Sequence, residues 1–135
     1  MDKKILVIED DPATSRLVDY TLRHEGYEVI RAANGLEGLQ KARNEKPDLL
    51  ILDVMLPGID GFEICHRLRS DIATSKLPIL MFSAKAQEID KKTGAKVGAD
   101  DYLTKPADPA EILNRVRNLL AKDKDAIPVR EKVNG

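Results

Sequence analysis

Side chains that could bind a metal ion and a phosphoryl group follow several short aliphatic runs of this chain. They are, in chain order, Glu9, Asp10 and Asp11, then Asp53, Ser83 and Lys105. Carboxylates gathered at one place repel each other unless a cation lies among them, and a small set of oxygen ligands favours Mg²⁺, with Mn²⁺ as the alternative, over zinc. A lysine and a serine hydroxyl would then bind an anion. Together these groups are suited to transferring a phosphoryl group onto an aspartate.

The apolar pattern predicts the elements that must position these side chains. Short apolar runs alternate with segments of helical spacing, which predicts strands at residues 5–8, 28–32, 49–52, 78–82 and 102–104. Such alternation indicates an α/β fold in which a doubly wound, five-stranded parallel sheet carries helices on both faces. Ligands of these sheets bind beyond the carboxyl ends of the strands, where the carboxylates, Ser83 and Lys105 are expected.

A helix is predicted after each strand, five in all. The last one has the clearest apolar stripe and begins at Asp108 and Glu111, which have the spacing of a capping box. The helix at residues 87–96 has a thin apolar face that Thr93 and Gly94 interrupt. We therefore expect it to be the least stable and most mobile helix.

Length and charge indicate one domain without an intrinsic affinity for nucleic acid. The 135 residues carry 22 Lys and Arg against 23 Asp and Glu, a net charge of -1. This balance argues against a surface that binds DNA phosphates by itself. Residues 1–121 are expected to form the domain. Residues 122–135 are dominated by charge and lack periodicity, which predicts a tail or a linker.

The amino terminus and the cysteine content favour a cytoplasmic protein with no membrane segment. The apolar run at residues 5–8 ends in acids and is too short for the core of a signal peptide or for a membrane span. The single cysteine, Cys65, can form no internal disulfide, which fits a reducing compartment. It falls on a helical apolar stripe and is expected to be a buried small hydrophobe.

Four motifs, in this order, resemble those of the receiver domain of bacterial two-component response regulators, the CheY-like family. They are Ile-Leu-Val-Ile-Glu-Asp-Asp-Pro, Asp-Leu-Leu-Ile-Leu-Asp-Val-Met-Leu-Pro-Gly-Ile-Asp-Gly, Pro-Ile-Leu-Met-Phe-Ser-Ala and Gly-Ala-Asp-Asp-Tyr-Leu-Thr-Lys-Pro. The resemblance covers residues 3–121. It implies a flavodoxin-like sheet with strand order 2-1-3-4-5 and five helices, and a switch that phosphorylation controls rather than an enzyme for an outside substrate.

The resemblance implies a phosphoacceptor and its metal ligands. Asp53 would accept the phosphoryl group from the phosphohistidine of a sensor histidine kinase or a phosphotransfer protein. Asp10, and Glu9 through a water molecule, would hold Mg²⁺ together with Asp53 and the backbone carbonyl of Met55. Asp11 is assigned to capping the first helix and stays outside the metal site.

The resemblance also implies how phosphorylation is sensed. Ser83 and Lys105 would contact phosphate oxygens, and Tyr102 would turn inward when Ser83 moves toward the phosphate. Lys105-Pro106 corresponds to the cis peptide bond of the family, and X-Pro bonds adopt cis at low cost. Ala107 departs from the family, because many members carry Phe there, and this affects local packing rather than the chemistry.

Receivers attached to winged-helix DNA-binding domains imply a dimer of the phosphorylated form. The charged pairs of that subfamily match Lys91 with Glu111, Asp101 with Arg115, and Asp100 with Lys122. A two-fold dimer needs self-complementary surfaces, and each pair of opposite charges across the axis would occur twice. Exposed pairs contribute about 0.2–1 kcal/mol each and would select the register of the dimer. DNA contacts would come from a downstream domain outside this chain.

Three alternative functions remain beside this one. A single-domain monomeric phospho-messenger would share the phosphoacceptor and lack the dimer. An Asp-nucleophile phosphatase would need a second acid two residues after the nucleophile, and Asp53 is followed by Val54 and Met55. A flavodoxin-like FMN module would need a glycine- and hydroxyl-rich phosphate loop after the first strand, where the chain instead has three acids.

Overall fold

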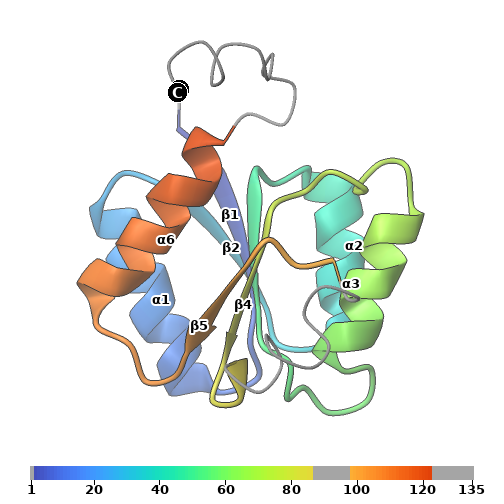
Figure 1. Cartoon of the computed structure of the whole chain (residues 1–135), viewed down its shortest axis with the longest axis horizontal. Helices are drawn as coiled ribbons and strands as arrows, with labels where there is room; N and C mark the ends of the chain where they lie inside the picture. Colours follow the sequence, from blue (N-terminus) through green and yellow to red (C-terminus); the bar gives the residue numbers. More distant parts are fainter. Residues whose placement is uncertain (1, 87–97, 123–135) are drawn as a thin grey trace, which may run out of the picture.

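The computed structural model describes residues 2–86 and 98–122, which form a parallel sheet between two layers of helices (Figure 1). The strands are β1 (Lys4–Ile8), β2 (Glu28–Ala32), β3 (Leu49–Leu52), β4 (Ile79–Ser83) and β5 (Asp101–Thr104). They are all parallel and lie in the order β2-β1-β3-β4-β5. The α/β class, the five-stranded parallel sheet and the strand order that we predicted are therefore confirmed.

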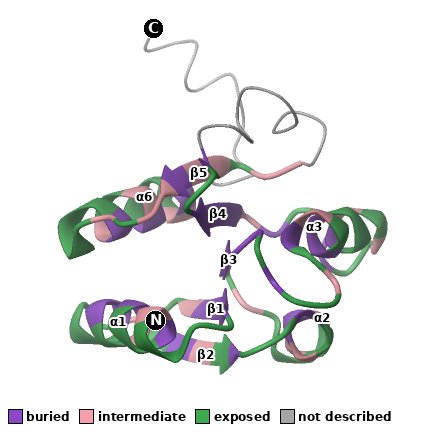
Figure 2. Ribbon diagram, turned by 90° about the horizontal axis from the view of Figure 1, so that it is seen from below, coloured by how far each residue is buried: buried purple, intermediate pink, exposed green. Residues whose placement is uncertain are grey.

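Helices cover both faces of the sheet, as expected for doubly wound connections. They are α1 (Pro12–His24), α2 (Gly35–Glu45), α3 (Gly61–Ser70) and α6 (Pro109–Ala121). Figure 2 shows α1 and α6 on one face and α2 and α3 on the other. The described residues thus contain four helices and not the predicted five, because the segment 87–96 lies outside them. None of these described helices has the length and apolar character that crossing a bilayer requires.

The central strands are buried on both faces, which explains their continuous aliphatic sequences. In β1, Ile5 and Val7 pack with residues of α1 and α6, whereas Leu6 and Ile8 pack with residues of α2 and α3. Successive strand residues point to opposite faces, so one strand contributes to both cores. The edge strand β2 has exposed positions at Glu28 and Arg31 and lacks this continuous burial.

Aspartate side chains cap the helices that follow β1 and β3. Asp11 accepts a hydrogen bond from the backbone N–H of Thr14 at the start of α1, and Asp60 accepts one from Glu63 at the start of α3. The capping box predicted at Asp108 is absent, because the backbone N–H of Glu111 donates to the carbonyl of Asp108 at 2.9 Å and no side-chain cap forms. Helix α6 ends at Ala121, and residues 123–135 lie outside the described residues.

Gly61 lets α3 begin directly against the loop that follows β3. Its N–H donates to the carbonyl of Val54 at 3.0 Å. A Cβ atom at this position would lie 2.7 Å from the carbonyl oxygen of Asp53 and 2.7 Å from the Cα of Val54. Any larger residue would displace this backbone, so the glycine fixes the loop that carries Asp53.

Candidate functional site

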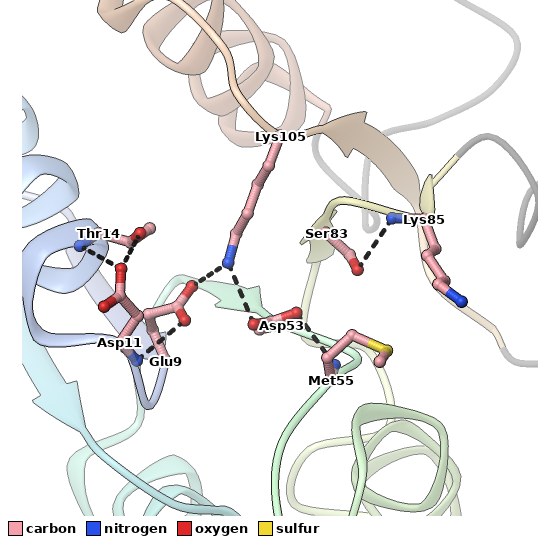
Figure 3. A network of polar contacts seen from close by, with 8 residues as sticks. All are labelled: Glu9, Asp11, Thr14, Asp53, Met55, Ser83, Lys85 and Lys105. Atoms are coloured by element: carbon pink, nitrogen blue, oxygen red, sulfur yellow. Dashed lines mark hydrogen bonds and ion pairs between the residues drawn. The ribbon is translucent and has the colours of Figure 1, made fainter.

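The carboxyl ends of four strands bring the predicted site residues together (Figure 3). Glu9 follows β1, Asp53 follows β3, Ser83 is the last residue of β4, and Lys105 follows β5. Backbone hydrogen bonds hold these strand ends side by side. The N–H of Asp53 donates to Ile8 at 3.1 Å, and the N–H of Lys105 donates to Ser83 at 3.0 Å. The topology of the sheet therefore creates the site.

Three carboxylates form an acidic cluster at this edge. One oxygen each of Glu9, Asp10 and Asp53 lies within 4.8 Å of the others. Glu9 and Asp53 are 4% and 6% exposed, whereas Asp10 is exposed. A compact set of carboxylate oxygens that is open on one side suits a hard divalent cation that keeps some of its waters. These residues fit Mg²⁺, as we predicted from the sequence.

The loop after β3 orients the carboxylate of Asp53. Its Oδ1 accepts a hydrogen bond of 3.0 Å from the backbone N–H of Met55, and the side chain of Met55 is exposed. This places Met55 beside Asp53, while its carbonyl as a metal ligand stays a prediction.

Lys105 lies between two buried carboxylates. Its Nζ donates to Glu9 Oε1 at 2.6 Å and to Asp53 Oδ2 at 3.1 Å. The same ammonium lies 5.4 Å from the centre of the Phe82 ring. An ion pair of this kind, with both carboxylates buried, resists the screening that weakens surface pairs. Lys105, which follows β5, therefore links the ends of β1 and β3 through Glu9 and Asp53.

The pKa values of both Glu9 and Lys105 are raised, for different reasons. Burial raises the pKa of the Glu9 carboxyl, and the hydrogen bond from Lys105 offsets this only in part. For Lys105, burial by itself would lower the pKa, but the hydrogen bonds and charges of Glu9 and Asp53 outweigh it, so the pKa is raised. The lysine therefore stays a cation at the site.

Ser83 and Tyr102, the predicted switch residues, lie on neighbouring strands. Ser83 is fully buried, and its hydroxyl oxygen accepts the backbone N–H of Lys85 at 3.3 Å. Figure 3 places Ser83 and Lys105 on either side of Asp53. Tyr102 is half-buried and packs against the core under α2 and α3. The movement of either residue on phosphorylation stays a prediction.

Asp11 and Cys65 have the roles that the sequence predicts. Asp11 caps α1 through Thr14, whose hydrogen bonds lower the pKa of the Asp11 carboxyl. Its backbone N–H also donates to Glu9 Oε2 at 3.2 Å, so it supports the acidic cluster indirectly. Cys65 is fully buried, and burial raises the pKa of its thiol to about 11.

The structure describes five of the six residues that we predicted for the dimer interface. Asp101 pairs with Arg115 of the same chain at 2.9 Å, and Asp100 pairs with Arg69 at 2.9 Å. Glu111 and Lys122 are exposed. Lys91 lies outside the described residues. Pairing between two copies stays a prediction.

Sequence reasoning missed one residue beside the site, Phe82, and one at the amino end of β5, Arg69. Phe82 lies under the ammonium of Lys105, but within an apolar strand it is indistinguishable from an ordinary core residue. Arg69 binds Asp100 from a distant helix, and no spacing rule connects residues so far apart in the chain.

Comparisons with known proteins identify related sequences. The model of the response regulator receiver domain family matches residues 5–117. The chain is 48% identical to the alkaline phosphatase synthesis transcriptional regulatory protein PhoP of Bacillus subtilis, over 99% of this chain and 55% of that protein. It is 50% identical to the DNA-binding dual master transcriptional regulator RpaA of Synechocystis, over 96% of this chain and 53% of that protein. The chain thus spans about half the length of these relatives.

Solved structures show the same fold. A putative response regulator from Chloroflexus aurantiacus has a TM-score of 0.85 and 44% identity, with 90% of this chain and 100% of that chain covered. The receiver domain of the sensor histidine kinase PA1611 from Pseudomonas aeruginosa has a TM-score of 0.83 and 27% identity, with 90% and 100% covered. That structure has a magnesium ion coordinated in its active-site cleft.

Proposed function

The chain belongs to the response regulator receiver domain family, and on that premise we propose that it is a switch controlled by phosphorylation of Asp53. A sensor histidine kinase or a phosphotransfer protein would donate the phosphoryl group. The observation that carries the proposal is the buried Asp53 carboxylate, held by Lys105 at 3.1 Å and flanked by two further acids. The proposed reactions are the protein's own phosphorylation and dephosphorylation, with no outside substrate.

The residues around Asp53 are suited to each part of the transfer. A carboxylate oxygen of Asp53 would attack the phosphorus of the phosphohistidine, forming an O–P bond as the N–P bond breaks. The electron pair stays on the imidazole nitrogen, which takes up a proton. The N–H of Met55 orients the carboxylate, and the ammonium of Lys105 and the hydroxyl of Ser83 would stabilise the charge on the transferred oxygens.

Glu9, Asp10 and Asp53 would hold Mg²⁺ at this site. The ion would supply positive charge to the carboxylates and to the phosphoryl oxygens. A cation at this place would also relieve the repulsion among the three acids, whose oxygens lie within 4.8 Å of one another.

Replacing Asp10 with alanine is expected to weaken Mg²⁺ binding by at least about tenfold, because one of three clustered carboxylates is lost. Asp10 is exposed, so the circular dichroism spectrum should not change. Isothermal titration with MgCl₂ measures the affinity. Asp11→Asn is the matched control, because asparagine keeps the cap of α1 and should leave Mg²⁺ binding nearly unchanged. Equal affinity of Asp10→Ala and wild type would move the metal site elsewhere.

We further propose that phosphorylation changes the face formed by β5 and α6. Ser83 would move toward the phosphoryl group, and Tyr102 would turn inward behind it. Lys105 would link the phosphoryl group to β5, because it already bonds Asp53 from the end of that strand. Two related proteins are named as transcriptional regulators, so the output in a longer protein would be DNA binding by another domain. The proposal implies a cytoplasmic protein.

Dimerisation of the activated form is expected to depend on Arg115. In sedimentation experiments, Mg²⁺ with beryllofluoride, which takes the place of the phosphoryl group, should shift the wild type from monomer toward dimer. Arg115→Glu would place like charges opposite Asp101 and weaken the dimer by about tenfold or more. It should still bind beryllofluoride at Asp53.

Arg117 provides the matched control for this experiment. It lies on the same helix, is 56% exposed and pairs with Glu25, the residue that follows α1, so Arg117→Glu should leave the dimer unchanged. A wild type that stays monomeric at high concentration with beryllofluoride bound would refute the dimer. A monomeric phospho-messenger would then be the better function.

A further inference from the structure

Two consecutive acids at the start of β5 are held by arginines from opposite faces of the sheet. Asp100 is bound by Arg69 of α3, and Asp101 is bound by Arg115 of α6. Strand β5 is four residues long and lies at the edge of the sheet, where β4 is its one partner among the described strands. Figure 1 shows the chain before β5 running toward α3. The start of this strand therefore depends on side-chain contacts more than the central strands do.

Arg69 joins three separate segments through one side chain. Its Nε donates to the carbonyl of Gly98 at 2.9 Å, and its Nη1 donates to the carbonyls of Ser75 at 3.1 Å and Leu77 at 2.7 Å. Its Nη2 donates to Asp100 Oδ2 at 2.9 Å. The planar guanidinium has several donors in a fixed arrangement, which lysine cannot reproduce. Arg69 thus ties the end of α3 to the loop before β4 and to the residues before β5.

Asp100 connects this contact to the sheet itself. Its Oδ2, which Arg69 binds, also accepts the backbone N–H of Ile79 at 2.8 Å. Its own N–H donates to the carbonyl of Ile79 at 2.9 Å. The pair of Asp100 and Ile79 therefore lies where β4 and β5 first meet. Arg69 binds this pair through the carboxylate of Asp100.

A neighbouring arginine, Arg67, forms an ordinary surface pair. Arg67, on the same helix, binds Glu63 one turn away, and both side chains are 49% exposed. Such pairs contribute little to stability. Arg69 is 20% exposed and binds three backbone carbonyls outside its own helix. Its role in the fold is therefore different from that of Arg67.

We propose that Arg69 is a positioning residue of the switch: it fixes the amino end of β5, and with it Tyr102, relative to α3 and β4. The functional meaning of this inference rests on the proposed role of Tyr102. Arg69 lies at the end of α3, whereas Asp53 precedes the start of that helix. Arg69 therefore acts on the response of β5 and not on phosphorylation itself.

Amide hydrogen exchange followed by NMR tests directly whether Arg69 anchors the amino end of β5 to α3 and β4. In Arg69→Gln, the amides of Ile79 and Asp100 should exchange about tenfold faster or more, because charged hydrogen bonds to partly buried groups are lost. Amides of β1 and β3 should change much less. Arg69→Lys should give an intermediate increase, since one ammonium cannot replace all four bonds. Arg67→Gln, the matched control, should match the wild type.

The second measurement asks whether the anchor matters for the switch. Arg69→Gln should bind Mg²⁺ and beryllofluoride with wild-type affinity, yet the change in the Tyr102 amide shift on binding should be at most about half that of the wild type. If the wild type binds no beryllofluoride, the proposed phosphoacceptor is wrong, and the exchange rates still decide whether Arg69 is an anchor.

Three results would overturn the inference: unchanged exchange at Ile79 and Asp100, an equal increase in every strand, or a normal Tyr102 response in Arg69→Gln. If Arg69→Gln does not fold, Asp100→Asn replaces it, because asparagine can still accept the Ile79 N–H while losing the charge. It should show a smaller increase at the same two amides, because the other three hydrogen bonds of Arg69 remain. An unchanged rate in Asp100→Asn would equally reject the anchor.

Discussion

Replacing Asp53 with asparagine is expected to abolish phosphoryl uptake. The amide has almost the same shape as the carboxylate but is a poor nucleophile, so the acyl phosphate cannot form. The fold should persist, because asparagine can still accept the N–H of Met55. Incubation with acetyl phosphate and MgCl₂, followed by phosphate-affinity electrophoresis, should show a shifted band for the wild type and none for Asp53→Asn.

Asp11→Asn is the control for the loss of a neighbouring acid. Asp11 belongs to the same acidic segment but caps α1, and asparagine is an equally good cap. This variant should still give the shifted band. A shifted band of normal intensity in Asp53→Asn would mean that another residue is the nucleophile.

Removing Lys105 is expected to change both stability and signalling. In Lys105→Ala, Glu9 and Asp53 lose the cation that compensates their buried charges. Urea unfolding in EDTA should show a loss of about 2–3 kcal/mol, and Mg²⁺ should restore part of it. Mg²⁺ binding should become severalfold tighter, because the ammonium no longer competes for the same oxygens. Lys41→Ala, which removes a partly exposed pair with Glu37, should cost less than about 1 kcal/mol.

The same variant should uncouple the phosphoryl group from β5. Lys105 is the side chain that reaches Asp53 from the end of β5, so its loss removes the direct link. With beryllofluoride bound, Lys105→Ala should show no inward shift of Tyr102 by NMR. A Tyr102 response equal to that of the wild type would reject this role of Lys105.

The sequence predicts the site well because parallel strands end at one edge. Glu9, Asp53 and Lys105 are far apart in the chain, yet each follows an apolar run whose register places it beside the others. Periodicity and strand ends are enough for this prediction. Strand β2 ends at Ala32 without a charged group and contributes no side chain to this set.

Contacts that depend on side-chain conformation could not be predicted in this way. Arg69 and Asp100 are separated by 31 residues, and both occur in charged surroundings that resemble a solvated surface. The capping box predicted at Asp108 and Glu111 has the right residue types. The N–H of Glu111, however, donates to the backbone carbonyl of Asp108 and not to its side chain. Local spacing shows which groups are available for a hydrogen bond, whereas tertiary packing decides which of them form it.

Intact mass spectrometry of the wild type tests the central claim most directly. The protein is incubated with acetyl phosphate in MgCl₂ or in EDTA, and each sample is then treated with hydroxylamine. We expect the mass of one added phosphoryl group in MgCl₂ only, and its loss on treatment, because an acyl phosphate reacts with hydroxylamine. Equal uptake in EDTA, or a phosphoryl group that hydroxylamine does not remove, would contradict a Mg²⁺-dependent phosphoacceptor at Asp53.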